Sequence, residues 1–134
     1  MNVYLAIKYH ASLKNRKHSE LILHTLESLG ISTSFVQRDL ENWSTIRLTP
    51  GELMKASFSL INKSDKVLLD LSEKGVGLGI EAGYAHAKDI PVLVIAKQYS
   101  DISTTLKGIC TGPHFYSDER DLVELLKKLF SQPN

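Results

Sequence analysis

Residues 66–83 read KVLLDLSEKGVGLGIEAG, and this stretch decides the fold. Its first part, from Val67 to Leu71, is apolar except for Asp70 and shows no alternation. An unalternated apolar run of this length is typical of a strand that is buried on both faces of a parallel sheet. A glycine-rich loop over residues 72–79 and a helix of small residues over 80–88 are predicted to follow. Strand, loop and helix in this order form the repeating unit of α/β proteins.

The same alternation of strands and helices extends in both directions from this stretch. Apolar runs predict buried strands at residues 3–7 and 91–97, and shorter strands at 31–35 and 114–116. Predicted helices cover residues 21–29, 50–61 and 118–130, with Gly30 and a Thr49–Glu52 capping box as end signals. We therefore expect one domain over residues 1–134, an α/β fold with a doubly wound, five-stranded parallel sheet. Its flavodoxin-like or Rossmann-like strand order is 2-1-3-4-5, with helices on both faces.

Sheets of this type bind ligands at the carboxyl ends of the strands, where the strand order reverses. In the order 2-1-3-4-5 this point lies between the first and third strands. The loops that meet there are residues 8–17 and 72–79. The fold alone thus predicts where a ligand binds.

The second of these loops contains Gly75, Gly77 and Gly79, directly before Glu81. Glycines let a backbone approach a ligand closely, and free N–H groups at a helix start attract anions. We expect Glu81 in the first turn of the helix, where the helix dipole favours its ionised form. Two roles are possible for Glu81. It is either a structural carboxylate that interacts with the helix dipole, or a nucleophile that attacks a sugar carbon.

Other candidate residues are predicted to lie near the carboxyl ends of the same strands. Lys8 and His10 follow the first strand and are candidates to bind a phosphate or similar anion. Asp70 ends the third strand, where a carboxylate either acts in catalysis or caps a turn. Trp43 lies in a loop that either folds over a base or sugar, or packs against the core. Tyr4 belongs to the core unless its hydroxyl reaches the site.

Composition excludes several classes of function. Lys and Arg total 16 and Asp and Glu total 15, a net charge of +1 that argues against binding a nucleic acid polymer. The single cysteine, Cys110, excludes an internal disulfide and a multi-thiolate metal site, and it suits a reducing, cytoplasmic location. The apolar run 92–96 is shorter than the roughly 20 residues that span a bilayer. We therefore expect no membrane segment and no metal. Residues 77–82 match a dinucleotide-binding fingerprint, but the acidic residue that should follow about twenty positions later is missing, so we also expect no cofactor.

Two motifs resemble a known family. The sequences DKVLLD (residues 65–70) and GLGIEAGYA (residues 77–85) resemble the nucleoside 2-deoxyribosyltransferase superfamily, closest to its 2-deoxynucleoside 5-monophosphate N-hydrolase branch. Residues 90–94 and 3–6 continue the similarity. The resemblance implies that Glu81 attacks the anomeric carbon of a (deoxy)ribose, forming a glycosyl-enzyme intermediate that passes to water or to a second base. It also implies that Tyr4 matches the tyrosine of the first strand, and that the 5-hydroxyl or 5-phosphate lies near residues 8–10.

Two positions depart from the family pattern. The family usually has an aspartate at the position of Ser57, and an aspartate or serine at the position of Gly75. These groups orient the sugar, help to protonate the base or bind phosphate, and Asp70 and Glu73 are close enough in sequence to replace them. Two functions therefore remain open: an N-glycosidase or transferase acting on a nucleoside or nucleotide, and a nucleotide-binding module without turnover.

The resemblance also implies a homodimer. Family members pair through the region equivalent to the predicted helix 80–88. In this chain we expect that helix to present a face of small and aromatic residues, namely Ala82, Tyr84, Ala85 and His86.

Overall fold

The computed structural model describes residues 1–131, so that residues 132–134 of the predicted domain lie outside the described part. A five-stranded sheet forms the centre, with the strand order β2-β1-β3-β4-β5 and every neighbouring pair parallel. This is the fold predicted from the sequence. The strands are β1 (Asn2–Ile7), β2 (Ser32–Ser34), β3 (Lys66–Asp70), β4 (Val92–Lys97) and β5 (Thr111–Tyr116).

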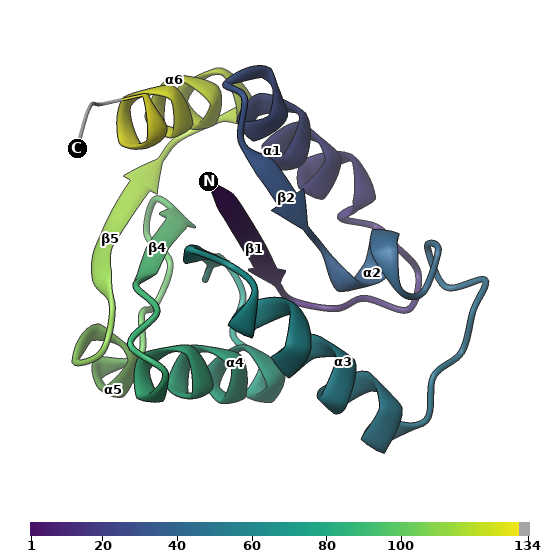
Figure 1. The fold of residues 1–134 in the computed structure, drawn as a ribbon. Helices are drawn as coiled ribbons and strands as arrows, with labels where there is room; N and C mark the ends of the chain where they lie inside the picture. The colour runs from purple at the N-terminus through teal and green to yellow at the C-terminus, as the bar shows by residue number, and fades with distance from the viewer. Residues whose placement is uncertain (132–134) are drawn as a thin grey trace.

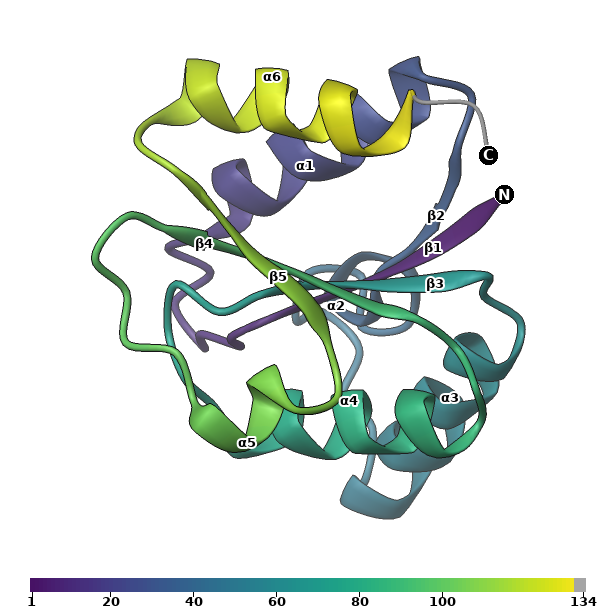
Figure 2. The same ribbon diagram turned by 90° about the vertical axis from the view of Figure 1, so that its left-hand side faces the viewer.

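Helices cover the two faces of the sheet, as the edge-on view shows (Figure 2). Helices α1 (Arg16–Ser28) and α6 (Glu119–Phe130) lie on one face. Helices α3 (Pro50–Asn62) and α4 (Val76–Ala87) lie on the other, together with the short α5 (Thr104–Lys107). A further short helix, α2 (Val36–Asp39), follows β2 (Figure 1).

Alternation along the central strands divides the core into two layers. Leu5 of β1 and Leu68 of β3 are fully buried against α1 and α6. Tyr4 and Leu69, their neighbours in sequence, belong to the layer that contains α3 and α4. Because successive strand residues point to opposite faces, each position at the carboxyl edge is assigned to one layer or the other.

Several local signals are confirmed. Thr49 and Glu52 form a complete capping box at the start of α3, with Pro50 in the first turn. Gly30 has a φ of +81°, the left-handed conformation expected just after α1. The structure adds a cap at the start of α6, where the Asp118 side chain accepts a hydrogen bond from the backbone of Asp121.

Three predicted boundaries are wrong. Strand β5 begins at Thr111, three residues before the predicted start at residue 114. Helix α4 begins at Val76 rather than at residue 80, so the glycines 77 and 79 belong to its first turns and the loop ends at Gly75. Helix α1 begins at Arg16, five residues before the first apolar residue of its periodic pattern. Glycine and charged residues are tolerated in a first turn, so hydrophobic periodicity misses that turn. Among residues 1–131, no helix is both long and apolar enough to cross a membrane.

Candidate active site

A cavity of about 400 Å³ lies at the carboxyl end of β1, on the face covered by α3 and α4. It occupies the region predicted from the strand order, between the ends of β1 and β3. Six of the residues predicted to form the site line it: Tyr4, Lys8, Ser57, Gly75, Gly77 and Glu81. The fold therefore brings together residues that are up to 77 positions apart in the sequence.

Glu81 lies in the second turn of α4, and its side chain points into this cavity. Its Oε2 atom is buried and has no hydrogen-bond partner. Burial raises the pKa of Glu81 to about 7, and the nearby Tyr4 hydroxyl lowers it only in part. The expectation that Glu81 occupies the first turn and is held ionised there is wrong, because the helix begins five residues before it.

Tyr4 and Ser57 are the polar neighbours of Glu81 on the floor of the cavity. Tyr4 is 1% exposed, and both its burial and the charge of Glu81 raise its pKa far above the ordinary value. The tyrosine is therefore a neutral O–H donor beside the carboxyl. Ser57, also buried, donates its hydroxyl hydrogen to the Leu53 carbonyl at 2.8 Å, and its oxygen remains available to accept. A hydrogen bond from the Tyr4 hydroxyl can therefore hold the Glu81 carboxylate in one orientation.

The glycines and Lys8 form the rim where α4 begins. Gly75 is the N-cap of α4 in an extended conformation. A Cβ atom at this position would lie 3.1 Å from Cδ of Lys8, so the missing side chain leaves room for the lysine. Added Cβ atoms at Gly77 and Gly79 would meet nothing within 4 Å. Space beside an exposed backbone is consistent with close approach of a ligand to the start of α4.

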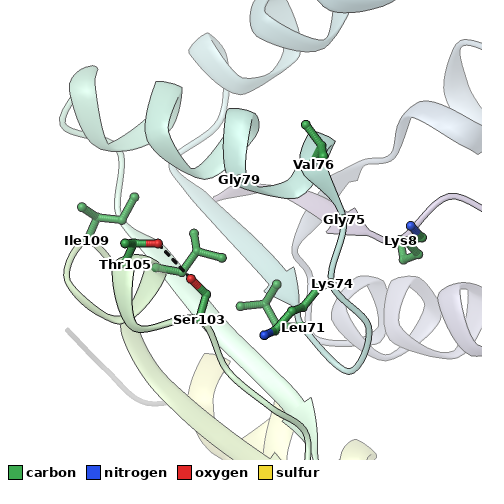
Figure 3. Close-up of a pocket in the computed structure, with 10 residues that line it drawn as sticks. Lys8, Leu71, Lys74, Gly75, Val76, Gly79, Ser103, Thr105 and Ile109 are labelled. Carbon is green, nitrogen blue, oxygen red and sulfur yellow. Dashed lines mark hydrogen bonds between the residues drawn. The ribbon is translucent and has the colours of Figure 1, made fainter.

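Lys8 also lines a second cavity on the same face, of about 610 Å³ (Figure 3). This cavity lies between the start of α4 and α5, and Gly79 lines it rather than the first. Ser103 and Thr105 form part of its wall and are hydrogen-bonded to each other at 2.8 Å. Gly75 and Lys8 thus lie at the boundary between the two cavities.

The structure does not bring Asp70 together with Glu81. Asp70 is 1% exposed and lies on the opposite face of the sheet, since it alternates with Leu69 along β3. Its Oδ2 atom accepts hydrogen bonds from His18 and from the Tyr116 hydroxyl, both at 2.9 Å. Although burial alone would raise the pKa of Asp70, its hydrogen bonds with His18 and with Ser72 lower it overall. The hypothesis that Asp70 replaces the aspartate missing at Ser57 is therefore wrong.

His10 and Trp43 also lie outside the cavity of Glu81. His10 is paired with Glu73 at 2.9 Å, and this hydrogen bond lowers the pKa of Glu73. Trp43 packs edge-on against Phe35 with ring centroids 5.8 Å apart, and the Arg16 guanidinium lies 4.3 Å from its ring centroid. Of the two alternatives for Trp43, packing against the core is the one that the structure shows.

Sequence reasoning missed part of the wall. Gln37 and Glu41, from α2 and the turn after it, line the cavity, as do Leu53 and Met54 of α3 and Tyr9 after β1. A four-residue helix leaves no periodic signal, so the sequence predicts no element over this segment. The position of this segment directly after the carboxyl end of β2 is the clue that could have found it. Within residues 1–131, no group of three His, Cys, Asp or Glu residues is arranged to hold a metal ion.

Comparison with proteins of known sequence finds a relative along almost the full length of the chain. A protein of the archaeon Thermofilum pendens, provisionally named 2'-deoxynucleoside 5'-phosphate N-hydrolase 1, is 26% identical over 137 residues, covering 96% of this chain and 94% of the relative. The chain resembles the nucleoside 2-deoxyribosyltransferase superfamily. No family model matches the chain.

Solved structures with a similar fold include two proteins whose names fit this superfamily. A CMP N-glycosidase of Clostridium botulinum matches with a TM-score of 0.72 and 17% identity, over 97% of this chain and 100% of that one. A 2-deoxyribosyltransferase of Bacillus psychrosaccharolyticus matches with a TM-score of 0.67 and 16% identity, over 92% and 90%. A conserved protein of Enterococcus faecalis matches with a TM-score of 0.74 and 18% identity, over 97% and 99%. These matches show that the chain shares the fold of these proteins.

Proposed function

We propose that this chain is an enzyme that cleaves or transfers the N-glycosidic bond of a (deoxy)nucleoside or nucleoside 5'-phosphate. The observation that carries the proposal is the cavity that contains the unpartnered Oε2 of Glu81 beside Tyr4. The names of the Thermofilum relative and of two structural neighbours support the same class of reaction.

In the proposed reaction, the ionised Glu81 carboxylate forms a bond to the anomeric carbon of the sugar. The bond from that carbon to the base nitrogen breaks, and its electron pair leaves with the base. Water, or the nitrogen of a second base, then attacks the same carbon, and the bond between that carbon and Glu81 breaks with its electron pair returning to the carboxylate. The proton that the attacking group loses ends on the released base. Tyr4 orients the carboxylate through its hydroxyl. A partly desolvated carboxylate with a pKa of about 7 is ionised in about half of the molecules at neutral pH.

We propose that the phosphate of a nucleotide substrate binds at the start of α4. The first backbone N–H groups of a helix have no partner within the helix, and here the first bond of this kind runs from Gly79 to Gly75. Lys8 lies beside Gly75 and takes part in no ion pair within residues 1–131. An ammonium group beside free amides favours a phosphate.

The test is release of free base from a panel of nucleosides and 5'-monophosphates, followed by chromatography. We expect release by the wild-type protein, and a loss of at least about 1000-fold for Glu81→Gln, which removes the nucleophile and preserves the shape. Glu73→Gln is the matched control, since Glu73 is a carboxylate of the same edge that does not line the cavity. Full activity of Glu81→Gln would refute the role of Glu81.

The second candidate function is nucleotide binding without turnover. The raised pKa of Glu81 and the small residues at Ser57 and Gly75 favour it, because less of the carboxylate is ionised and fewer polar groups contact the sugar. Calorimetry separates the two functions. A wild-type protein that binds nucleotides but releases no base from any of them would establish the binding module.

We also propose that the chain acts as a cytoplasmic homodimer, but the predicted face needs correction. His86 is exposed as predicted, but Ala82 and Ala85 are fully buried inside the protomer, and Tyr84 stacks on Phe58 with ring centroids 4.1 Å apart. The apolar side chains that α4 exposes are instead Val76, 84% exposed, and Ile80, 46% exposed. Light scattering should give twice the mass of the chain, and Ile80→Lys should return the monomer.

A further inference from the structure

A second glutamate, Glu41, also lines the cavity of Glu81. Glu41 follows α2 and is partly buried in the wall of the cavity. Its carboxylate is paired with neither a hydrogen-bond donor nor a cation in the part of the chain described, and burial raises its pKa. A carboxylate that loses water on burial is stabilised by N–H or O–H donors, so this group is suited to a ligand that supplies them.

The two ends of the cavity differ in chemistry. Lys8, Gly75 and Gly77 come from the end of β1 and the start of α4, where we propose the phosphate binds. The wall formed by α2 and α3 contributes Gln37 and Glu41 together with the apolar side chains of Val36, Leu53 and Met54. In the proposed reaction Glu81 lies beside the anomeric carbon, and that carbon carries the base, so the base also lies in this cavity.

A nucleobase matches that wall. The two faces of its ring are apolar and flat, while its edge carries N–H donors and acceptors. Val36, Leu53 and Met54 offer apolar contact to the faces, and Gln37 and Glu41 offer polar contact to the edge. An ionised carboxylate can only accept hydrogen bonds, whereas a glutamine side chain can both donate and accept.

Resting on the function proposed above, we propose that Glu41 selects the base: the substrate carries an exocyclic amino group, as guanine, cytosine and adenine do. Guanine presents its N1–H and its amino group side by side, so that a carboxylate can accept two parallel bonds. Cytosine and adenine donate one bond from the amino group. Uracil and thymine present their N3–H between two carbonyl oxygens, which repel a carboxylate.

The experiment measures binding separately from turnover. Affinities for dGMP, dCMP, dAMP, dUMP and dTMP are determined by calorimetry on the Glu81→Gln protein, and base release is measured on the wild-type protein. Hydrogen bonds to a charged group stabilise by about 1.5–3 kcal/mol, so we expect the three amino bases to bind roughly tenfold or more tightly than dUMP and dTMP. Adding Glu41→Gln should remove most of this preference. Adding Glu124→Gln, on the exposed surface of α6, should preserve it.

Each outcome separates this proposal from the one on which it rests. A preference for amino bases that Glu41→Gln removes supports the proposal, with or without base release. Release of base without the preference, or a preference that survives Glu41→Gln, overturns the role of Glu41 alone. Binding with the preference but no release overturns only the proposed reaction. Failure of every nucleotide to bind overturns both.

Discussion

Replacing Glu81 with Gln should make the protein more stable at alkaline pH. Folding buries the Glu81 carboxyl and raises its pKa from 4.5 to about 7. Between these two values the unfolded chain has lost a proton that the folded chain retains, so the free energy of unfolding falls as the pH rises. Each pH unit corresponds to about 1.4 kcal/mol, which gives a total cost of about 3 kcal/mol above pH 7. The glutamine carries no charge and avoids this cost.

Urea unfolding of the wild type and of Glu81→Gln at pH 5 and at pH 8 measures the effect. At pH 8 we expect the variant to be more stable by about 3 kcal/mol, which shifts the urea midpoint upward by about 1 M or more. At pH 5 the difference should shrink to about 1 kcal/mol or less, because folded Glu81 is then protonated. Glu124→Gln, at a site where the side chain is 69% exposed, should change stability little at either pH. A gain that is equal at both pH values, or no gain at pH 8, would refute the argument from burial.

Three further predictions concern the two faces of the sheet. The rate of base release should rise with pH and level off above about 7, since Glu81 must be ionised to attack; a rate that is flat from pH 5 to pH 8 would contradict this. Asp70→Asn should destabilise the protein by about 3 kcal/mol in urea unfolding, because the buried carboxylate bonds His18 and Tyr116. The wild-type contribution of Asp70 should be present above pH 3.8 and disappear as the pH falls through its lowered folded pKa. Gly75→Ala should displace Lys8, whose Cδ would lie 3.1 Å from the new Cβ, and weaken 5'-monophosphate binding in calorimetry roughly tenfold while nucleoside binding changes little.

The fold was predictable because its strongest signals are local. The unalternated strand at residues 67–71 indicated a parallel sheet, and the strand order then located the cavity and Glu81 without any contact information. The capping box at Thr49 and the glycine at residue 30 depend only on neighbouring residues, and both are found in the structure.

The site was predicted less completely, because its remaining features depend on tertiary placement. The sequence places both Asp70 and Glu81 near the carboxyl edge of the sheet. A shift of one residue along β3 moves a side chain to the opposite face, and the sequence pattern does not show which face Asp70 occupies. Trp43 could cover a ligand or pack inward, and only the position of Phe35 and Arg16 settles that choice. The pKa of Glu81 depends on how much of the carboxyl is desolvated, which no sequence pattern reports.

All residues that line the cavity of Glu81 lie between Tyr4 and Glu81 in the sequence. Strands β4 and β5 and helix α6 complete the sheet and cover it, yet they contribute no side chain to this cavity. The chain thus has a first segment whose side chains line the cavity and a later segment whose side chains mainly complete the sheet and its core. We expect substitutions beyond residue 90 to leave the lining of this cavity unchanged where the apolar side chains under α4, such as Val92 and Val94, are kept.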